Sequence, residues 1–270
     1  MLLQGKNAVI YGAGGSLGGA VARAFAAAGA QVFLSGLHEH NVRETAEGII
    51  AAGGNASQAV VDALDKRAVD QHMESVVRQA GSVDISFNAI GWRDVQNMPL
   101  TEMEPDDFLR PLNVAMTTQF LTGTAAGRVM KQQQSGVILS LTATPGGIGY
   151  PMTGGFGPAC CAVEGFSRNF ASEMGQFGVR VVNIRSAGSP DSRPFMEAMA
   201  ADQEMGTWFL NKLKDDTMLK ALPAMEDIAN VAVFLASPMA GKITGVTIDV
   251  TAGTTTGINY RIADIPLVSA

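Results

Sequence analysis

The segment NAVIYGAGGSLGGAVARAF, residues 7–25, decides the fold. It opens with an apolar, β-prone run typical of a buried strand, passes through a glycine-rich turn and continues with a helical apolar period. A turn of this kind lets backbone N–H groups approach a pyrophosphate, and the positive end of the following helix adds to the attraction. The segment therefore predicts the first strand, turn and helix of a dinucleotide-binding fold.

The rest of the chain alternates short apolar runs with amphipathic segments of helical length. The expected strands are 7–11, 31–35, 57–62, 83–89, 136–141, 179–185 and 245–250, and the expected helices are 18–28, 41–52, 66–80, 106–130, 157–176 and 226–236. Nearly continuous, β-branched strands suit a parallel sheet that is covered on both faces. This order predicts an α/β fold with a doubly wound parallel sheet of the Rossmann type, as one domain over residues 1–270.

Segment 189–220 interrupts this alternation. It is rich in Met, Asp and Lys, with Trp208 and Phe209 near its middle. An irregular insertion of this length is often a lid over a binding pocket. We therefore expect a helical substrate lid here.

Composition limits the kind of function. The 270 residues are 47% hydrophobic and 16% charged, with a formal net charge of −6. Without a cluster of Lys and Arg, a nucleic-acid partner is not expected. Residues 132–163 carry no charge, but Pro145, Pro151 and Pro158 argue against a membrane span, so no membrane partner is expected. Two adjacent cysteines predict neither a disulfide framework nor a metal site, and favour a cytoplasmic location.

Taken together, these segments resemble the short-chain dehydrogenase/reductase family, which includes the 3-oxoacyl-ACP reductases. Gly12 and Gly18 match the glycine turn of that family, whereas Tyr11 and Ser16 depart from it. VVDALD, FNAIG and RSAGSPDS resemble its adenine, ribose and nicotinamide segments. The resemblance implies that NAD or NADP is held by Gly12, Ser16, Leu17, Gly18, Leu37, Asp62, Ala63, Asn88, Ala89 and Gly188.

The end of the second strand bears on the choice of cofactor. A carboxylate there would bind the ribose 2′-hydroxyl of NAD, and an Arg would pair with the 2′-phosphate of NADP. Ser35, Gly36 and Leu37 provide neither group. The missing carboxylate favours NADP(H), and the nearby His38, His40 and Arg43 are alternative contacts for a phosphate.

The catalytic positions depart from the family. It uses a Tyr as proton donor, a Lys four residues later, a Ser thirteen residues earlier and a helical Asn. The corresponding positions here are Phe156, Cys160 and Ala143, with Asn113 as the match to the Asn. A one-residue loop insertion would instead place Thr142 in the Ser role. The ordinary proton relay cannot be assembled from these side chains.

Other side chains are candidates for replacement chemistry. Tyr150 lies in the loop before the expected helix 157–176, and its phenol is a candidate for the acid-base role. Glu164 lies one turn beyond Cys160, but an i,i+4 pair with Arg168 favours a structural role. Cys160 at a helix start is a candidate nucleophile.

Three functional hypotheses follow. The first is an NADP(H)- or NAD(H)-dependent oxidoreductase that acts on a carbonyl, hydroxyl or enoyl small molecule through a non-standard relay of Tyr150, Thr142, Asn113 and water. The second is a nucleotide-binding protein without redox turnover, and the third is a non-redox lyase or isomerase. The resemblance implies a homodimer or homotetramer through helices 106–130 and 157–176, and the apolar tail after Gly253 is expected to dock on a neighbouring subunit.

Overall fold

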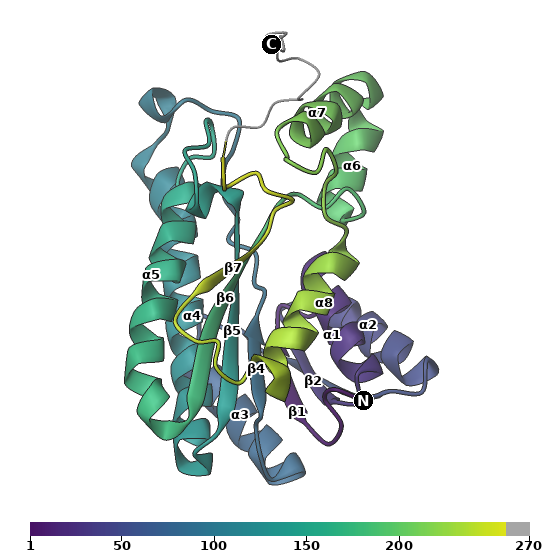
Figure 1. The fold of residues 1–270 in the computed structure, drawn as a ribbon, viewed down its shortest axis with the longest axis vertical. Helices are drawn as coiled ribbons and strands as arrows, with labels where there is room; N and C mark the ends of the chain where they lie inside the picture. The colour runs from purple at the N-terminus through teal and green to yellow at the C-terminus, as the bar shows by residue number, and fades with distance from the viewer. Residues whose placement is uncertain (258–270) are drawn as a thin grey trace, which may run out of the picture.

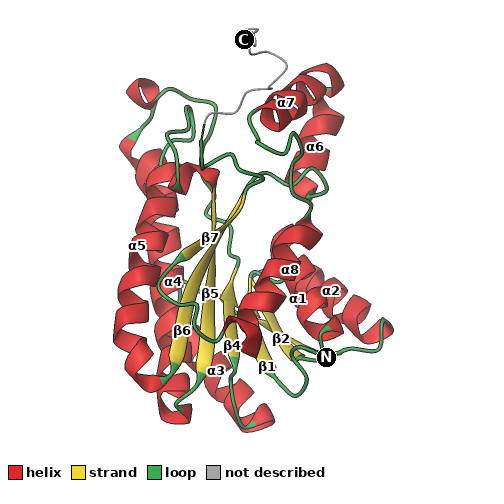
Figure 2. Cartoon of the chain, viewed as in Figure 1, coloured by secondary structure: helices red, strands yellow, loops and turns green. Residues whose placement is uncertain are grey.

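The computed structural model describes residues 1–257, in which strands and helices alternate (Figures 1 and 2). Seven parallel strands form one sheet in the order β3-β2-β1-β4-β5-β6-β7. The strands are β1 Asn7–Tyr11, β2 Gln31–Gly36, β3 Asn55–Val60, β4 Ile85–Asn88, β5 Gly136–Ala143, β6 Val179–Ser186 and β7 Thr247–Val250. The order reverses direction between β1 and β4, which is where doubly wound sheets bind their ligands.

Helices cover both faces of the sheet. They are α1 Ser16–Ala27, α2 Glu39–Ala51, α3 Lys66–Ala80, α4 Pro105–Gln133, α5 Phe156–Met174, α6 Arg193–Ala201, α7 Gln203–Asp215 and α8 Met225–Ala236, with short 3-10 turns at Leu100–Glu102, Thr144–Gly146, Gly175–Phe177 and Pro238–Ala240. Helices α1, α2 and α8 pack on one face, and α3, α4 and α5 on the other (Figure 1). The fold predicted from the sequence is confirmed.

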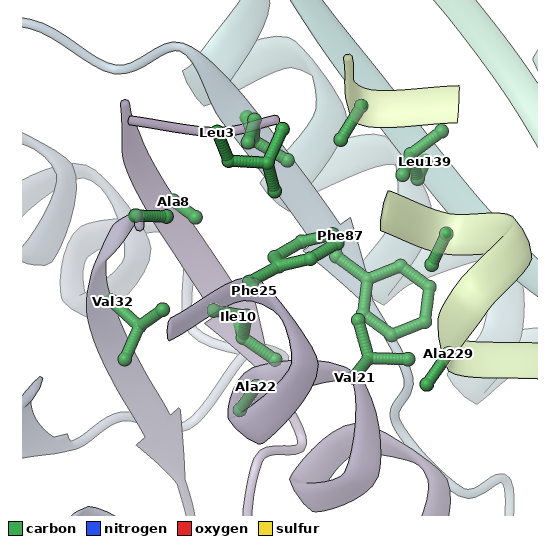
Figure 3. Close-up of a cluster of buried hydrophobic side chains, with 14 of the residues drawn as sticks. Leu3, Ala8, Ile10, Val21, Ala22, Phe25, Val32, Phe87, Leu139 and Ala229 are labelled. Atoms are coloured by element: carbon green, nitrogen blue, oxygen red, sulfur yellow. The ribbon is translucent and has the colours of Figure 1, made fainter. Parts of the chain in front are cut away.

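The core lies between these layers. Because successive residues of a strand point to opposite faces, Ile10 packs with Phe25 of α1 on one side, whereas Val9 packs under α3 and α4 on the other. Phe25 and Phe87 are fully buried in the first cluster, together with Leu139 from β5 (Figure 3). This packing fixes the carboxyl ends of β1, β4 and β5 relative to one another.

The bounds of several predicted strands differ by one or two residues from the structure, and for two of them the physical reason is clear. The strand expected at 57–62 is β3, Asn55–Val60, because its pairing with β2 begins at Gln31 and Asn55. Its alternating exposure fits an edge strand rather than a buried apolar run. The last strand begins at Thr247 instead of 245, since Gly245 has a φ of +70° and turns the chain before it can pair.

Segment 189–220 contains α6 and α7, which lie beyond the carboxyl ends of the strands (Figure 1). In the part of the chain that the structure describes, none of the helices is long and apolar enough to cross a membrane. Most of the tail that was expected to dock on a neighbour, residues 258–270, lies outside the described residues.

Candidate active site

The glycine turn after β1 packs so closely that larger residues are excluded. Gly12 has a φ of +79°, and a Cβ there would stand 2.7 Å from the carbonyl oxygen of Ala89. A Cβ on Gly18 would stand 2.3 Å from the carbonyl oxygen of Gly12. Gly15 then caps α1, which leaves the first N–H groups of that helix without a side-chain partner. These groups make the turn fit to hold a pyrophosphate.

A first cavity of about 450 Å³ opens beside this turn and is referred to as the nucleotide cavity. Five of the predicted cofactor residues line it: Gly12, Leu37, Asp62, Ala63 and Ala89. The sequence did not point to Asn41 of α2 or Thr118 of α4, which also line it because helix packing brings them there. The cavity therefore gathers the segments expected to bind adenine, ribose and pyrophosphate.

The other predicted cofactor residues act from outside the nucleotide cavity. Asn88 is buried, where its Nδ2 donates to Thr122 Oγ1 at 3.0 Å and its Oδ1 accepts from the N–H of Ile90 at 3.1 Å. It thus shapes the turn that carries Ala89. Ser16 Oγ accepts from the N–H of Arg193 at 3.0 Å and ties the start of α1 to that of α6, while Leu17 packs on the core.

A second cavity of about 410 Å³, the substrate cavity, lies between the sheet and the α6–α7 segment. Ala143, Tyr150, Phe156 and Gly188 line it together with side chains of α6 and α7. Ala143 ends β5 and Gly188 follows β6, so both come from carboxyl ends of adjacent strands. The structure therefore brings together Tyr150, Phe156 and Gly188, which the sequence placed in one site.

Behind Phe156 lies an apolar cluster. The ring of Trp92 packs on that of Phe156 with centroids 5.2 Å apart, and Ala115 and Cys160 are fully buried beside them. Trp92 itself is 5% exposed, and its indole N–H has no hydrogen-bond partner among residues 1–257. Trp92 was not predicted from the sequence, because a Trp after a glycine turn carries no signal of its own.

The chemistry of Cys160 follows from this burial. Desolvation raises the pKa of the thiol to about 12, although a hydrogen bond with the backbone of Ala143 acts in the opposite direction. The sulfur is therefore a neutral thiol at physiological pH. This removes the basis for Cys160 as a nucleophile at a helix start.

Two predicted relay residues lie away from the substrate cavity. Thr142 is 2% exposed, and its Oγ1 donates to Glu164 Oε1 at 2.9 Å while accepting from Asn183 Nδ2 at 2.7 Å. It has no free hydrogen for a substrate oxygen. Asn113 is exposed on α4, because two residues along a helix turn a side chain by about 200° and Ala115 occupies the inward face. The structure thus does not bring Thr142 or Asn113 to Tyr150.

Glu164 pairs with a residue other than the one expected. Its Oε1 accepts from Nε of Arg185 at 2.9 Å and its Oε2 from Nη2 at 2.5 Å, and Arg185 also binds Asp249 at 2.8 Å. Both partners of the first pair are nearly buried, with side-chain exposures of 11% and 13%. The predicted pair with Arg168 was wrong, since Glu164 faces the sheet and Arg168 lies exposed on the same helix.

Tyr150 is half-buried in the wall of the substrate cavity. Burial raises the pKa of its phenol, and the nearby carboxylate of Asp216 raises it further. The hydroxyl is therefore protonated at physiological pH and acts as a hydrogen-bond donor.

Comparison with known proteins agrees with this geometry. A family model described as Enoyl-(Acyl carrier protein) reductase matches residues 12–255. An uncharacterised oxidoreductase of Thermotoga maritima is 30% identical, with 94% of this chain and 99% of that protein covered. The 3-oxoacyl-[acyl-carrier-protein] reductase of Escherichia coli is 27% identical over 94% and 98%. The crystal structure of an NAD+-bound xylitol dehydrogenase superposes with a TM-score of 0.86 at 23% identity, covering 94% of this chain and all of that one.

Proposed function

Because the chain belongs to the short-chain dehydrogenase/reductase family of oxidoreductases, we propose that it interconverts a small carbonyl or enoyl compound and its reduced form with NADP(H). We further propose that Tyr150 supplies the proton that the family takes from the position of Phe156. One observation carries this proposal: Tyr150 and Phe156 line the same cavity. Of the other tyrosines, Tyr11 is 1% exposed under α3, and Tyr260 lies outside the described residues.

Tyr150 is suited to donate but not to remain ionised. The residues of the nucleotide cavity would hold the cofactor, whose nicotinamide would supply a hydride for the carbonyl carbon while the carbonyl π electrons pass to the oxygen. The phenol then gives its proton to that oxygen, which is a stronger base than a phenolate. Since burial and Asp216 raise the pKa of Tyr150, the phenolate recovers a proton from solvent. Without a neighbouring ammonium group, this step is expected to be slow.

The nucleotide cavity supports the preference for NADP(H). Leu37 at the end of β2 is 47% exposed and offers no carboxylate to a ribose 2′-hydroxyl. His38, Arg93 and Arg193 line the same cavity and are available to an anionic phosphate. Arg43 instead pairs with Glu39 at 3.5 Å, and His40 does not line the cavity. We therefore assign the 2′-phosphate to the side of the cavity that carries His38.

Segment 189–220 is proposed to act as the lid of the substrate cavity, because Phe195, Phe209 and Leu213 in it form one wall.

We also propose that a second copy of the chain packs on α4 and α5. Phe120 on this face is 54% exposed, and its ring lies 6.4 Å from that of Phe166. Gel filtration tests this subunit contact, and a monomeric protein would contradict it.

The test of function separates binding from turnover. Calorimetric titration is expected to give tighter binding of NADPH than of NADH, by about tenfold, the weight of one charge-assisted contact. Loss of NADPH absorbance with a panel of ketones and enones is expected to be slow but measurable. Tight NADPH binding with no turnover on any substrate would favour the nucleotide-binding protein instead, in line with the apolar cluster behind Phe156. Absence of cofactor binding would contradict the proposal outright.

A further inference from the structure

The walls of the substrate cavity are formed mainly by rings and aliphatic side chains. Tyr150 and Phe156 come from the sheet side, and Phe195 and Phe209 from the α6–α7 segment. The rings of Phe195 and Phe209 stack with centroids 6.4 Å apart and planes 20° apart. Aromatic pairs of this kind present flat, rigid surfaces, so a flat ligand gains more from them than a flexible chain.

The aromatic wall reaches the reacting end of the cavity. A Cβ on Gly188 would stand 2.4 Å from the ring of Phe195, so this ring lies directly on the turn after β6. Phe156 stands at the start of α5 and is held from behind by Trp92. A substrate between Phe195 and Phe156 is therefore enclosed by apolar faces next to the group that reacts.

Polar contacts in the cavity are few and uncharged apart from one acid. Besides Tyr150, amide or hydroxyl groups are offered by Gln96, Asn97, Thr144, Thr153 and Thr254, and Asp216 is the carboxylate. Lys212 already holds Asp216 in an ion pair on the surface of α7. Within residues 1–257, no Lys, Arg or His side chain lines this cavity. An anionic group on a ligand would be desolvated without a partner, which is costly.

From these observations we propose that the substrate is an uncharged, ring-containing ketone or the corresponding alcohol, bound flat between the Phe195–Phe209 pair and Phe156. This inference rests on the function proposed above and names its substrate class. A volume of about 410 Å³ lies near the lower end of small-molecule pockets, in keeping with a compact bicyclic body. Carboxylated and phosphorylated substrates are excluded by the lack of a cation.

Calorimetry with four probes of similar carbon skeleton tests the class, using the full chain with and without NADP+, so that no reduction occurs. The probes are 2-tetralone, its carboxylated and aminomethyl derivatives, and the open-chain 2-decanone. We expect 2-tetralone to bind at least about tenfold more tightly than each of the other three in at least one of the two states. Equal or tighter binding of any of those three, or no binding of 2-tetralone in either state, would overturn the assignment.

Lid variants locate the binding surface. Phe209→Ala is expected to weaken 2-tetralone binding at least about fivefold, with Phe209→Leu in between, because the ring contributes both area and stacking. Met205→Ala, on the same helix and 59% exposed, is the matched control and should leave binding unchanged. Unchanged affinity in Phe209→Ala would contradict the proposal. If 2-tetralone binds in this way but is never reduced, the proposed substrate class holds and the proposed redox function fails. If the protein instead prefers to reduce an acyclic acid, the redox function holds and the substrate class fails.

Discussion

The rings of Trp92 and Phe156 pack in a tilted arrangement, with centroids 5.2 Å apart and planes 46° apart, and belong to a buried apolar cluster. Large rings fill the volume that small Ala115 and Cys160 leave open. Since interiors are close-packed, these four residues behave as one unit, and a change at one position is felt by the others.

The first prediction concerns Cys160→Lys, which introduces the residue that the family resemblance implies for this position. Cys160 is fully buried in an apolar cluster, so the new ammonium would lose its hydration, and the nearby carboxylate of Glu164 is already paired with Arg185. An uncompensated buried charge costs about 3 kcal/mol or more of the free energy of unfolding. Urea unfolding measures this loss. Cys161→Lys, exposed on the same helix, should change stability by less than about 0.5 kcal/mol; equal stability of the two variants would show that the cluster is not closed.

The two cysteines should also differ in reactivity. Because burial raises the pKa of Cys160 to about 12, its thiolate is absent at pH 8, whereas Cys161 is exposed. Iodoacetamide followed by peptide mass spectrometry is expected to label Cys161 in the folded protein and both residues after denaturation. Because of the raised pKa, the thiol of Cys160 keeps its proton in the native state at pH values where the unfolded state has lost it. The free energy of unfolding is therefore expected to fall as the pH rises from about 9 towards 12. Rapid labelling of native Cys160 would refute the burial.

The Glu164–Arg185–Asp249 ion network provides a stability test. Glu164→Ala would leave the nearly buried guanidinium of Arg185 with the carboxylate of Asp249 and the carbonyl of Gly146, and would remove the acceptor of Thr142. The free energy of unfolding should fall by about 2 kcal/mol or more. Arg168→Ala removes an exposed charge from the same helix and should cost less than about 0.5 kcal/mol. A comparable loss in both variants would point back to an i,i+4 pair.

The burial of His72 predicts how the free energy of unfolding changes at acidic pH. Its ring packs against Tyr11 with centroids 5.7 Å apart, its Nδ1 is buried without a hydrogen-bond partner in the described part of the chain, and burial lowers its pKa to about 4. The unfolded state therefore binds the proton more strongly, so the stability contributed by neutral His72 is complete above about pH 6.5 and is lost as pH falls towards 4. Urea unfolding at pH 7 and pH 5 measures this change. Between these two pH values, the free energy of unfolding of His72→Phe should fall less than that of the parent. As a control, His40→Gln changes an exposed residue and should show the pH dependence of the parent. If His72→Phe also kept that pH dependence, the role assigned to His72 would be contradicted.

The fold was predictable because its signals are local. The glycine turn at Gly12 and Gly18 and the apolar period of each strand define the βαβ units without reference to distant residues. The site was harder to predict, because its decisive contacts join distant parts of the chain. Glu164 of α5 contacts Arg185 of β6, and Trp92 joins Cys160 only when the loop after β4 packs against the start of α5. Asn113 lies exposed on α4, and sequence alone does not say which face of that helix turns inward.

The central claim is that Tyr150 supplies the proton, and single-turnover hydride transfer from NADPH to 2-tetralone tests it most directly. Tyr150→Phe is expected to slow this transfer by at least about 100-fold, the usual weight of a general acid, while leaving NADPH binding unchanged. Met152→Leu, exposed in the same loop, should transfer at the parental rate. A Tyr150→Phe variant that reduces 2-tetralone as fast as the parent would contradict the account.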